Sequence, residues 1–390
     1  MNILHTSDWH LGHRLYEYDR VEEQQSMLDQ IAGIVAEKKP DVFLLAGDVF
    51  DSSAPAASTQ KMYVQAMLKI CKANKDMQVV VISGNHDSAA KLDVEKDIWE
   101  VFHVHTICYI EKEHLEDLIV EVPGRGFVIA VPYCYDRNMP ENLWQDLQNM
   151  VAQRNTNHLP VVMMAHTTVA GMDFTGHKNQ DTIIGNIESV AVETMGNGYD
   201  YLALGHIHKP QFIHTGNHNV CYSGSPIDIS FDEKFEHTVN LVHLESNTIP
   251  KVEKIHIKNA HPLINIPNDG FLPWEEVKEQ LERMDDNLNA YVRLNVEVEQ
   301  HLPTSAMDSA SEIAERKHSR VCFINEKKKE IEGGSTENVP TVMSVDELKA
   351  LSPVEMAEQY MKRKGEPFTD DIRDVIKEAV LQVENDERNN

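Results

Sequence analysis

Short runs of apolar residues recur along the first two thirds of the chain, and glycine or a polar residue follows most of them. Clear examples are residues 42–45, 79–82 and 161–165, which are long enough for a strand and too short for a typical helix. Polar positions do not alternate with apolar ones inside these runs. We therefore expect strands of a sheet that is covered on both faces, as in parallel α/β sheets.

Helical patterns lie between the first of these strands. Apolar residues recur every three or four positions within residues 20–38, and Pro40 ends that segment. A second helix is expected at residues 59–72. Together with a strand at the N-terminus, the order strand, helix, strand, helix, strand predicts a layered α/β domain. Further strands are expected at residues 118–122, 127–132, 200–204, 220–223, 238–244 and 252–257.

The pattern changes after residue 260. Two helical segments alternate with three short apolar runs, which predicts a small α/β domain at residues 261–326, after a larger domain at residues 1–260. A linker with lysine, glycine and serine follows at residues 327–344. Residues 345–390 carry apolar stripes at helical spacing. Such helices either dock into the groove of a partner protein or pack back on their own chain, and the linker favours docking.

The charge of the chain narrows the classes of function. Its 390 residues include 36 basic and 63 acidic ones, which gives a net charge of −27. Proteins that bind nucleic acid neutralise phosphates with positive charge, so action on a polyanion would require bound cations or a basic partner. The five cysteines form no Cys-x-x-Cys pair, and we find neither a secretory leader nor a long apolar run. These features predict a reduced cytoplasmic protein without a membrane span.

Side chains that can bind metals follow five of the expected strands. Mixed carboxylate, amide and imidazole ligands suit manganese, iron or zinc, and no thiolate is among them. A carboxylate shared by two cations is a common way to hold a phosphate during its displacement, and Asp48 is central in the set. The sequence therefore predicts a two-metal centre built from Asp8, His10, Asp48, Asn85, His166, His206 and His208.

A single histidine or aspartate at the start of a loop is more often a turn or capping residue than a ligand. His103 and His105 have the same spacing as His206 and His208 but lack a neighbouring Gly-Asp or Asn, so we assign them a structural role. The same assignment applies to His5, His13, His158, His177, His214 and His218. A possible metal ligand follows each of five expected strands, however, and coincidence does not easily explain this repetition.

Short motifs surround the candidate ligands, and they read Asp8-Trp9-His10, Gly47-Asp48-Val49-Phe50-Asp51, Gly84-Asn85-His86-Asp87, His166 and Gly205-His206-Ile207-His208. Their order resembles the calcineurin-like metallophosphoesterase family. The resemblance implies a four-layer α/β/β/α sandwich, with residues 261–326 as a capping domain and a helical tail. Phe50 stands where purple acid phosphatases have a tyrosine ligand, and Ser52 and Asp87 depart from the protein phosphatase pattern.

The resemblance also implies a role for each motif residue. Asp8, His10, Asp48 and His208 would surround one metal ion. The second ion would lie among Asp48, Asn85, His166 and His206. The family does not use the residue at His86 as a ligand but as the proton donor to the leaving oxygen, a task that suits an imidazole near neutral pH.

Residues that flank the motifs are similar to a bacterial branch of DNA-repair nuclease subunits, notably Gly224-Ser225-Pro226 and Ser230-Phe231-Asp232-Glu233. This similarity implies a manganese-dependent DNA exonuclease and endonuclease. It also implies a homodimer whose tails bind an SMC-like ATPase. Two alternatives remain open: a phosphodiesterase or phosphatase for small molecules, and a DNA-end scaffold without catalysis. The tail argues against the first, and the complete ligand set argues against the second.

Overall fold

The computed structural model describes residues 1–173, 175, 189–213, 219–299 and 301–329, with isolated positions at 361, 368, 369, 372 and 373. The chain divides into two units, Met1–Lys328 and Lys329–Asn390. The expected linker beyond residue 329 and the expected tail helices lie outside the described residues, apart from the isolated positions. The description below concerns the first unit.

The N-terminal sheet contains six strands in the order β14-β13-β1-β4-β5-β6. Its parallel part confirms three strands expected from apolar runs. The antiparallel strands β13 and β14 extend it along the free edge of β1. The bounds are β1 (Asn2–Thr6), β4 (Val42–Ala46), β5 (Gln78–Ile82), β6 (Val104–Ile107), β13 (Thr238–His243) and β14 (Lys251–His256).

A second six-stranded sheet has the order β11-β12-β10-β9-β8-β7. Its four central strands are parallel, and an antiparallel strand closes each edge. The bounds are β7 (Ile119–Val122), β8 (Gly126–Val131), β9 (Val161–His166), β10 (Tyr201–Gly205), β11 (Gln211–Ile213) and β12 (Val220–Tyr222).

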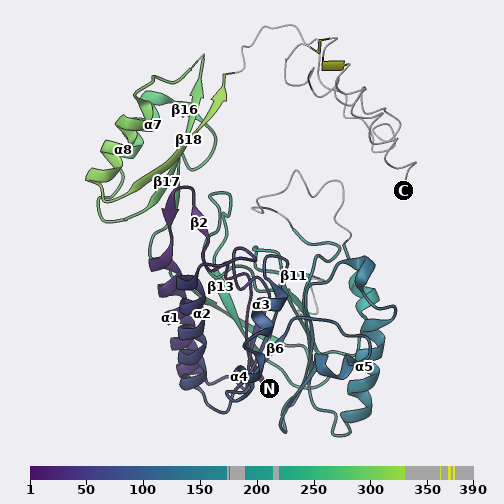
Figure 1. Cartoon of the computed structure of the whole chain (residues 1–390). Coiled ribbons are helices and arrows are strands. Elements are labelled where there is room, and N and C mark those ends of the chain that lie inside the picture. Colours follow the sequence, from purple (N-terminus) through teal and green to yellow (C-terminus); the bar gives the residue numbers. More distant parts are fainter. Residues whose placement is uncertain are drawn as a thin grey trace. The chain divides into compact units, whose positions relative to one another are not determined.

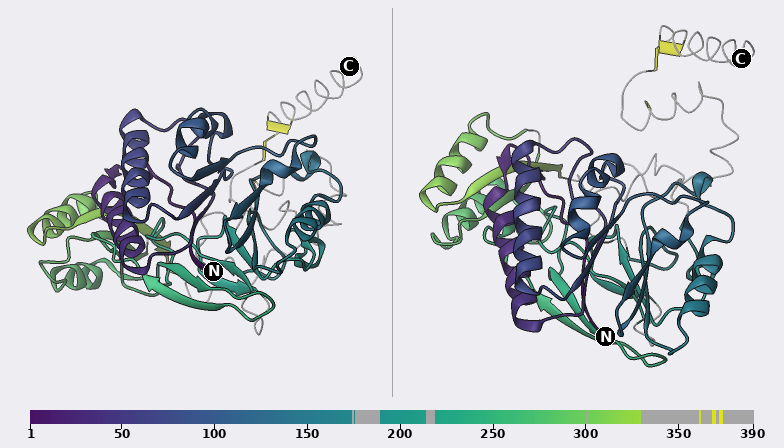
Figure 2. Two further views of the ribbon diagram at one scale, coloured as in Figure 1. Left: turned by 90° about the horizontal axis from the view of Figure 1, so that it is seen from below. Right: turned by 60° about the horizontal axis from the view of Figure 1, so that its bottom comes forward.

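The two sheets pack face to face, and helices cover their outer faces (Figures 1 and 2). Successive residues of β4 point to opposite sides, so Leu44 joins the core between the sheets while Phe43 joins the core beneath the helices. The first sheet is covered by α1 (Val21–Lys38) and α2 (Ala57–Ala73), and the second by α5 (Leu143–Arg154). This arrangement confirms the four-layer α/β/β/α sandwich.

Several elements were not expected from the sequence. They include the longer helix α5 and, among short elements, β6, β11 and 3₁₀ turns at Leu115–Leu118, Asp136–Asn138 and Val192–Met195. Two short helices, α3 (Ala89–Asp93) and α4 (Lys96–Glu100), follow the Gly84 motif. A hairpin of β2 (Arg14–Leu15) and β3 (Tyr18–Asp19) follows His10. Elements of two to five residues are too short to show a clear apolar period.

Residues after 260 form a sheet with its own hydrophobic core. Strand β17 lies at the centre and pairs in parallel with the other three strands. Two helices pack on this sheet, as expected, but the last strand runs to Lys328 rather than ending near residue 324. The bounds are β15 (Leu263–Ile266), β16 (Leu272–Pro273), α7 (Trp274–Glu282), β17 (Tyr291–Val298), α8 (Ala306–Arg316) and β18 (Arg320–Lys328).

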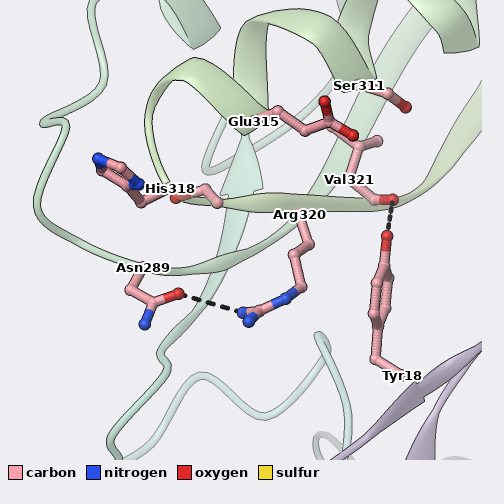
Figure 3. A pocket seen from close by; sticks show the side chains of 8 residues that line it. Tyr18, Asn289, Ser311, Glu315, His318, Arg320 and Val321 are labelled. Carbon is pink, nitrogen blue, oxygen red and sulfur yellow. Dashed lines mark hydrogen bonds between the residues drawn. The ribbon is translucent and has the colours of Figure 1, made fainter.

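The β2–β3 hairpin connects this small sheet to the larger sandwich. Tyr18 Oη donates to the carbonyl of Val321 over 3.5 Å, and Tyr291 Oη donates to the carbonyl of Asp19 over 3.4 Å. Figure 3 shows the pocket beside these contacts, where Arg320 also bonds to Asn289. None of the predicted site residues lines this pocket. No helix in the described part of the chain is long and apolar enough to cross a membrane.

Candidate metal centre

The candidate ligands meet at one edge of the sandwich. They follow the carboxyl ends of β1, β4, β5, β9 and β10, so both sheets contribute. Among the described residues, three groups have donor atoms that all lie within 4.8 Å of one another. These groups are Asp8, His10 and His208; His10, Asp48 and His86; and Asp48, His166 and His206. Asn85 contacts the two histidines of the third group, so the structure brings together every residue proposed from the sequence.

Asp48 lies between the two halves of the centre. Its Oδ2 atom is 3.4 Å from Nε2 of His166 and 3.7 Å from Nε2 of His10. Its Oδ1 atom accepts the backbone N–H of His86 over 2.9 Å. One carboxylate oxygen thus faces imidazoles from both sides, which is the position that a shared ligand requires.

On the first side, Nε2 of His10 and Nε2 of His208 lie 3.2 Å apart. Asp8 is fully buried beside them, and its carboxylate accepts bonds from Ser7 Oγ over 2.5 Å and from the His206 N–H over 3.0 Å. Two facing imidazole nitrogens and a buried carboxylate supply more lone pairs than protons. A divalent cation satisfies such a donor set.

On the second side, the side-chain oxygen of Asn85 is 3.0 Å from Nε2 of His166 and 2.9 Å from Nδ1 of His206. Nδ1 of His166 donates to the carbonyl of Ala46 over 2.8 Å. This bond fixes the tautomer, so the lone pair of Nε2 points at the oxygens of Asn85 and Asp48. Three acceptors that face one another again fit a cation.

The close approach of carboxylates and imidazoles also shifts the pKa values of His10, His166 and Asp48. Burial alone would lower the pKa of His10 and His166, but the carboxylates outweigh burial and raise both pKa values to about 9. Burial would raise the pKa of Asp48, yet the imidazoles of His166 and His10 hold it well below its usual range. The centre therefore attracts positive charge, and bound metal ions can supply that charge in place of protons.

Comparison with known proteins agrees with this chemistry. Residues 1–210 match the calcineurin-like phosphoesterase family. The chain belongs to this family. Its donor set is that of a centre for divalent metal ions, so the phosphoesterase depends on such ions.

Curated relatives of this phosphoesterase are named as the SbcD component of the nuclease SbcCD. The chain is 29% identical to the protein of Rhodobacter capsulatus in an alignment of 311 positions that covers 73% of this chain and 76% of that protein. It is 28% identical to the protein of Bacillus subtilis, covering 77% of this chain and 80% of the relative. For Escherichia coli the identity is 29%, with 69% and 71% covered.

His86 differs from the other histidines of the centre because its side chain is exposed to solvent. Its Nδ1 atom is 2.9 Å from the carbonyl of Asp51, so Nδ1 carries a proton and Nε2 is left for other partners. Its ring stands edge-on to that of His10, with centroids 4.9 Å apart. The geometry alone allows His86 to bind metal or to transfer a proton, and solvent access favours the proton.

The loop that carries Asn85 and His86 is held by Asp87. This half-buried carboxylate accepts backbone N–H groups of Gly84, Phe50 and Val49 over 2.8, 2.9 and 3.1 Å. Burial and the nearby Asp48 raise the pKa of Asp87 to about 6. Three bonds to two loops fix the position of His86 relative to the end of β4.

The motif glycines are explained by close approaches inside the phosphoesterase. A Cβ on Gly84 would lie 2.1 Å from Oδ1 of Asp48, and one on Gly205 would lie 1.9 Å from the carbonyl oxygen of Ala46. Gly47 has a φ of +85°, and its Cβ would reach Nδ1 of His166 at 2.2 Å. Each glycine therefore allows a close approach where a larger residue would displace a candidate ligand or the backbone at the end of β4.

Some residues of the site were not predicted from the sequence. Glu233 accepts a hydrogen bond from Nδ1 of His208 over 2.9 Å. The motif around it was recognised in the sequence, but no role followed from it. Among the histidines predicted to be structural, His5 contacts Tyr201 Oη and His105 contacts Gln78. His177, His214 and His218 lie outside the described residues.

Proposed function

We propose that this phosphoesterase is the nuclease subunit of an SbcCD-type complex. It hydrolyses DNA phosphodiester bonds, as exonuclease and endonuclease, in DNA repair and recombination. The observation that carries this proposal is the complete ligand set at the edge of the sandwich, in a chain that matches SbcD proteins over about three quarters of both lengths. We propose a cytoplasmic location, because bacterial DNA lies in that compartment.

Two divalent ions, Mn²⁺ in our proposal, occupy the two sides of the centre. Asp8, His10, Asp48 and His208 hold the first ion, and Asp48, Asn85, His166 and His206 hold the second. The contacts described above support this division, because Asp48 alone faces imidazoles of both sets. When bound, the ions polarise the phosphate and activate a water molecule for attack.

The chain itself positions the ions and moves the proton. His86 gives a proton to the oxygen that leaves when the phosphodiester bond breaks. The carbonyl of Asp51 orients the His86 ring through Nδ1, which leaves Nε2 to face the substrate. Asp87 fixes the position of this loop relative to the ligands, so the proton donor stays at a fixed place beside the metals.

Purified protein with Mn²⁺ is expected to degrade linear DNA, with weaker activity in Mg²⁺ and none after chelation. A parallel assay with cyclic nucleotides and a phosphate monoester tests the alternative of a small-molecule phosphodiesterase or phosphatase. Cleavage of these small substrates without cleavage of DNA, even with the ATPase partner SbcC and ATP present, would overturn the proposed nuclease function.

The proposed partners are inferred from the net charge of the chain and from its segments after residue 260. A chain with a net charge of −27 needs basic surface from elsewhere to hold DNA, and we propose that SbcC supplies it. Residues 345–390 form the SbcC-docking segment in this proposal, joined by the linker at residues 327–344. Residues 261–326 form a capping domain that narrows access to the metals and contacts DNA.

We also propose a homodimer within a heterotetramer with SbcC. The surface that supports it is an apolar patch around α4, composed of Val94 just after α3, Ile98 within α4, and Val101 and Phe102 just after α4. Their exposed fractions are 79%, 64%, 77% and 41%, and the four residues lie within nine positions of the chain. Exposed apolar patches of this kind mark protein contacts.

Changing Ile98 to aspartate is expected to convert the dimer into a monomer, because it places a charge in the centre of the apolar patch. Light scattering after size-exclusion chromatography measures the mass of the particle. Ile249→Asp is the matched control, since Ile249 is also exposed, at 65%, but lies in the turn between β13 and β14. A dimer that persists in the Ile98 variant would place the interface elsewhere.

A further inference from the structure

A chain of buried polar side chains reaches the metal centre from behind His208. It begins at Glu233, in the segment between β12 and β13, whose side chain is fully buried. Its Oε1 atom accepts the Nδ1–H of His208 over 2.9 Å, and its Oε2 atom accepts the backbone N–H of Ile229 over 2.8 Å. Both carboxylate oxygens are therefore engaged, and the carboxylate has one orientation.

This contact determines which nitrogen of His208 faces the centre. A proton on Nδ1 is held by Glu233, so Nε2 keeps its lone pair and points toward Nε2 of His10, 3.2 Å away. His166 is oriented by a neutral carbonyl instead. Glu233 differs from that carbonyl because it brings a full negative charge, which makes the imidazole a stronger electron donor.

His237 and Asp228 hold Glu233 in place. Nε2 of His237 lies 2.7 Å from Oδ1 of Asp228 and 3.7 Å from Oε2 of Glu233. Its Nδ1 atom faces the carbonyl of Ser225 at 2.9 Å. Nδ1 therefore donates to a carbonyl, while Nε2 lies near the half-buried carboxylate of Asp228 and the buried carboxylate of Glu233.

The far end of this chain of contacts reaches the start of the small domain. Asn259 donates to Oδ2 of Asp228 over 2.6 Å, and the buried Arg20 donates to the backbone carbonyl of Asp228. Arg20 also stands over the ring of Tyr291 in β17, 6.0 Å from its centre. The segment behind His208 is therefore anchored to both parts of the described unit.

We propose that Glu233 is a positioning residue for His208, held by His237 and Asp228, and that it sets the affinity of the first metal position. The proposal rests on the metal centre proposed above. It assigns a role to the Ser230-Phe231-Asp232-Glu233 motif, which the ligand set leaves unexplained. Glu233 itself is not a ligand, because its Oε1 contacts the side of the His208 ring away from the centre.

The test is to measure Mn²⁺ binding by titration calorimetry, using the purified full chain that carries Glu233→Gln. Glutamine has one acceptor where glutamate has two, so its amide N–H₂ must face a donor, either at His208 or at Ile229. We expect one of two Mn²⁺ equivalents to bind about 10- to 100-fold more weakly, as with other groups behind metal ligands. The second equivalent is expected to keep its affinity.

Glu236→Gln is the matched control, because it makes the same change three residues away at an exposed side chain. Asp228→Asn is a second variant that leaves Glu233 in place, and it is expected to weaken the same equivalent by a smaller factor. If Glu233→Gln does not fold, Asp228→Asn provides the test of the proposal. Thermal unfolding without metal shows whether each variant is folded.

Unchanged affinity for both equivalents in Glu233→Gln would overturn the positioning role, while the wild-type centre would still stand. Equal loss at both equivalents, with a lower unfolding temperature of the metal-free chain, would also overturn it, since that result marks a purely structural residue. A wild-type chain that binds no Mn²⁺ would instead refute the proposed metal centre and the positioning role together.

Discussion

Replacing His86 with alanine is expected to slow DNA cleavage by about 100- to 10,000-fold, the range that general acid catalysis contributes, while both Mn²⁺ ions stay bound. The reason is that His86 is proposed to donate a proton, whereas the other histidines of the centre are proposed to bind metal. His86 is exposed and oriented by the Asp51 carbonyl, whereas the ligand histidines His10 and His166 are buried. Single-turnover cleavage of linear DNA at saturating Mn²⁺ measures the chemical step without product release.

The matched control for this experiment is His114→Ala, which removes an exposed histidine ahead of β7 and is expected to leave the rate unchanged. A substrate whose leaving group needs no proton offers a further check. Wild type and variant are expected to cleave it at similar rates. If His86→Ala cleaves DNA as fast as wild type, His86 is not the proton donor. If it loses metal, His86 is a ligand.

Replacing Asp48 with asparagine is expected to weaken both metal positions and to reduce cleavage to background. Asparagine keeps the shape of the side chain and can still accept the His86 N–H through its carbonyl oxygen. Its N–H₂ group, however, would face Nε2 of His10 and of His166, where the carboxylate oxygen now lies. A donor at that point occupies the lone pairs that the ions need, and the shared negative charge is lost.

We expect a loss of Mn²⁺ affinity larger than the roughly 100-fold seen when a group behind the ligands is removed, and we expect it at both equivalents. Asp76→Asn, an exposed aspartate in the turn before β5, controls for the loss of one charge. Binding of a single Mn²⁺ by Asp48→Asn with normal affinity would show that Asp48 serves one ion and is not shared.

The strands that are buried on both faces were the part of the fold that could be predicted from the sequence. Residues 42–45 are continuously apolar because Phe43 packs under the helices while Leu44 packs between the sheets. A run of this kind reveals its strand directly, and the residue after it lies at the sheet edge by geometry. This explains why the candidate ligands could be proposed from the sequence although they span residues 8 to 208.

Other features depend on contacts that leave little trace in the sequence. The β2–β3 hairpin is stabilised largely by the small domain, through Tyr18 and Val321, and its strands have only two residues each. Asp8 and Asp48 adopt φ values of 52° and 49°, which neighbouring loops enforce and which residue type does not specify. Helix α5 did carry a usable pattern, since its buried residues Leu143, Leu147 and Val151 are spaced by four.

Glu233 shows why the supporting residues were harder to predict than the ligands. It lies 25 residues after its partner His208, in an irregular segment with no apolar period. The sequence contains many acidic residues, so charge alone does not mark this one. Only the three-dimensional contact with Nδ1 of His208 reveals its place beside the metal centre.

The central claim is that seven residues hold two ions with Asp48 shared, while His86 stands apart as the proton donor. The most direct test is the number of Mn²⁺ ions bound per chain, measured by equilibrium dialysis and elemental analysis for wild type, His86→Ala and Asp48→Asn in parallel. We expect two ions for wild type, two for His86→Ala and none for Asp48→Asn. Equal loss of metal from the two variants would show that His86 and Asp48 do not have different roles.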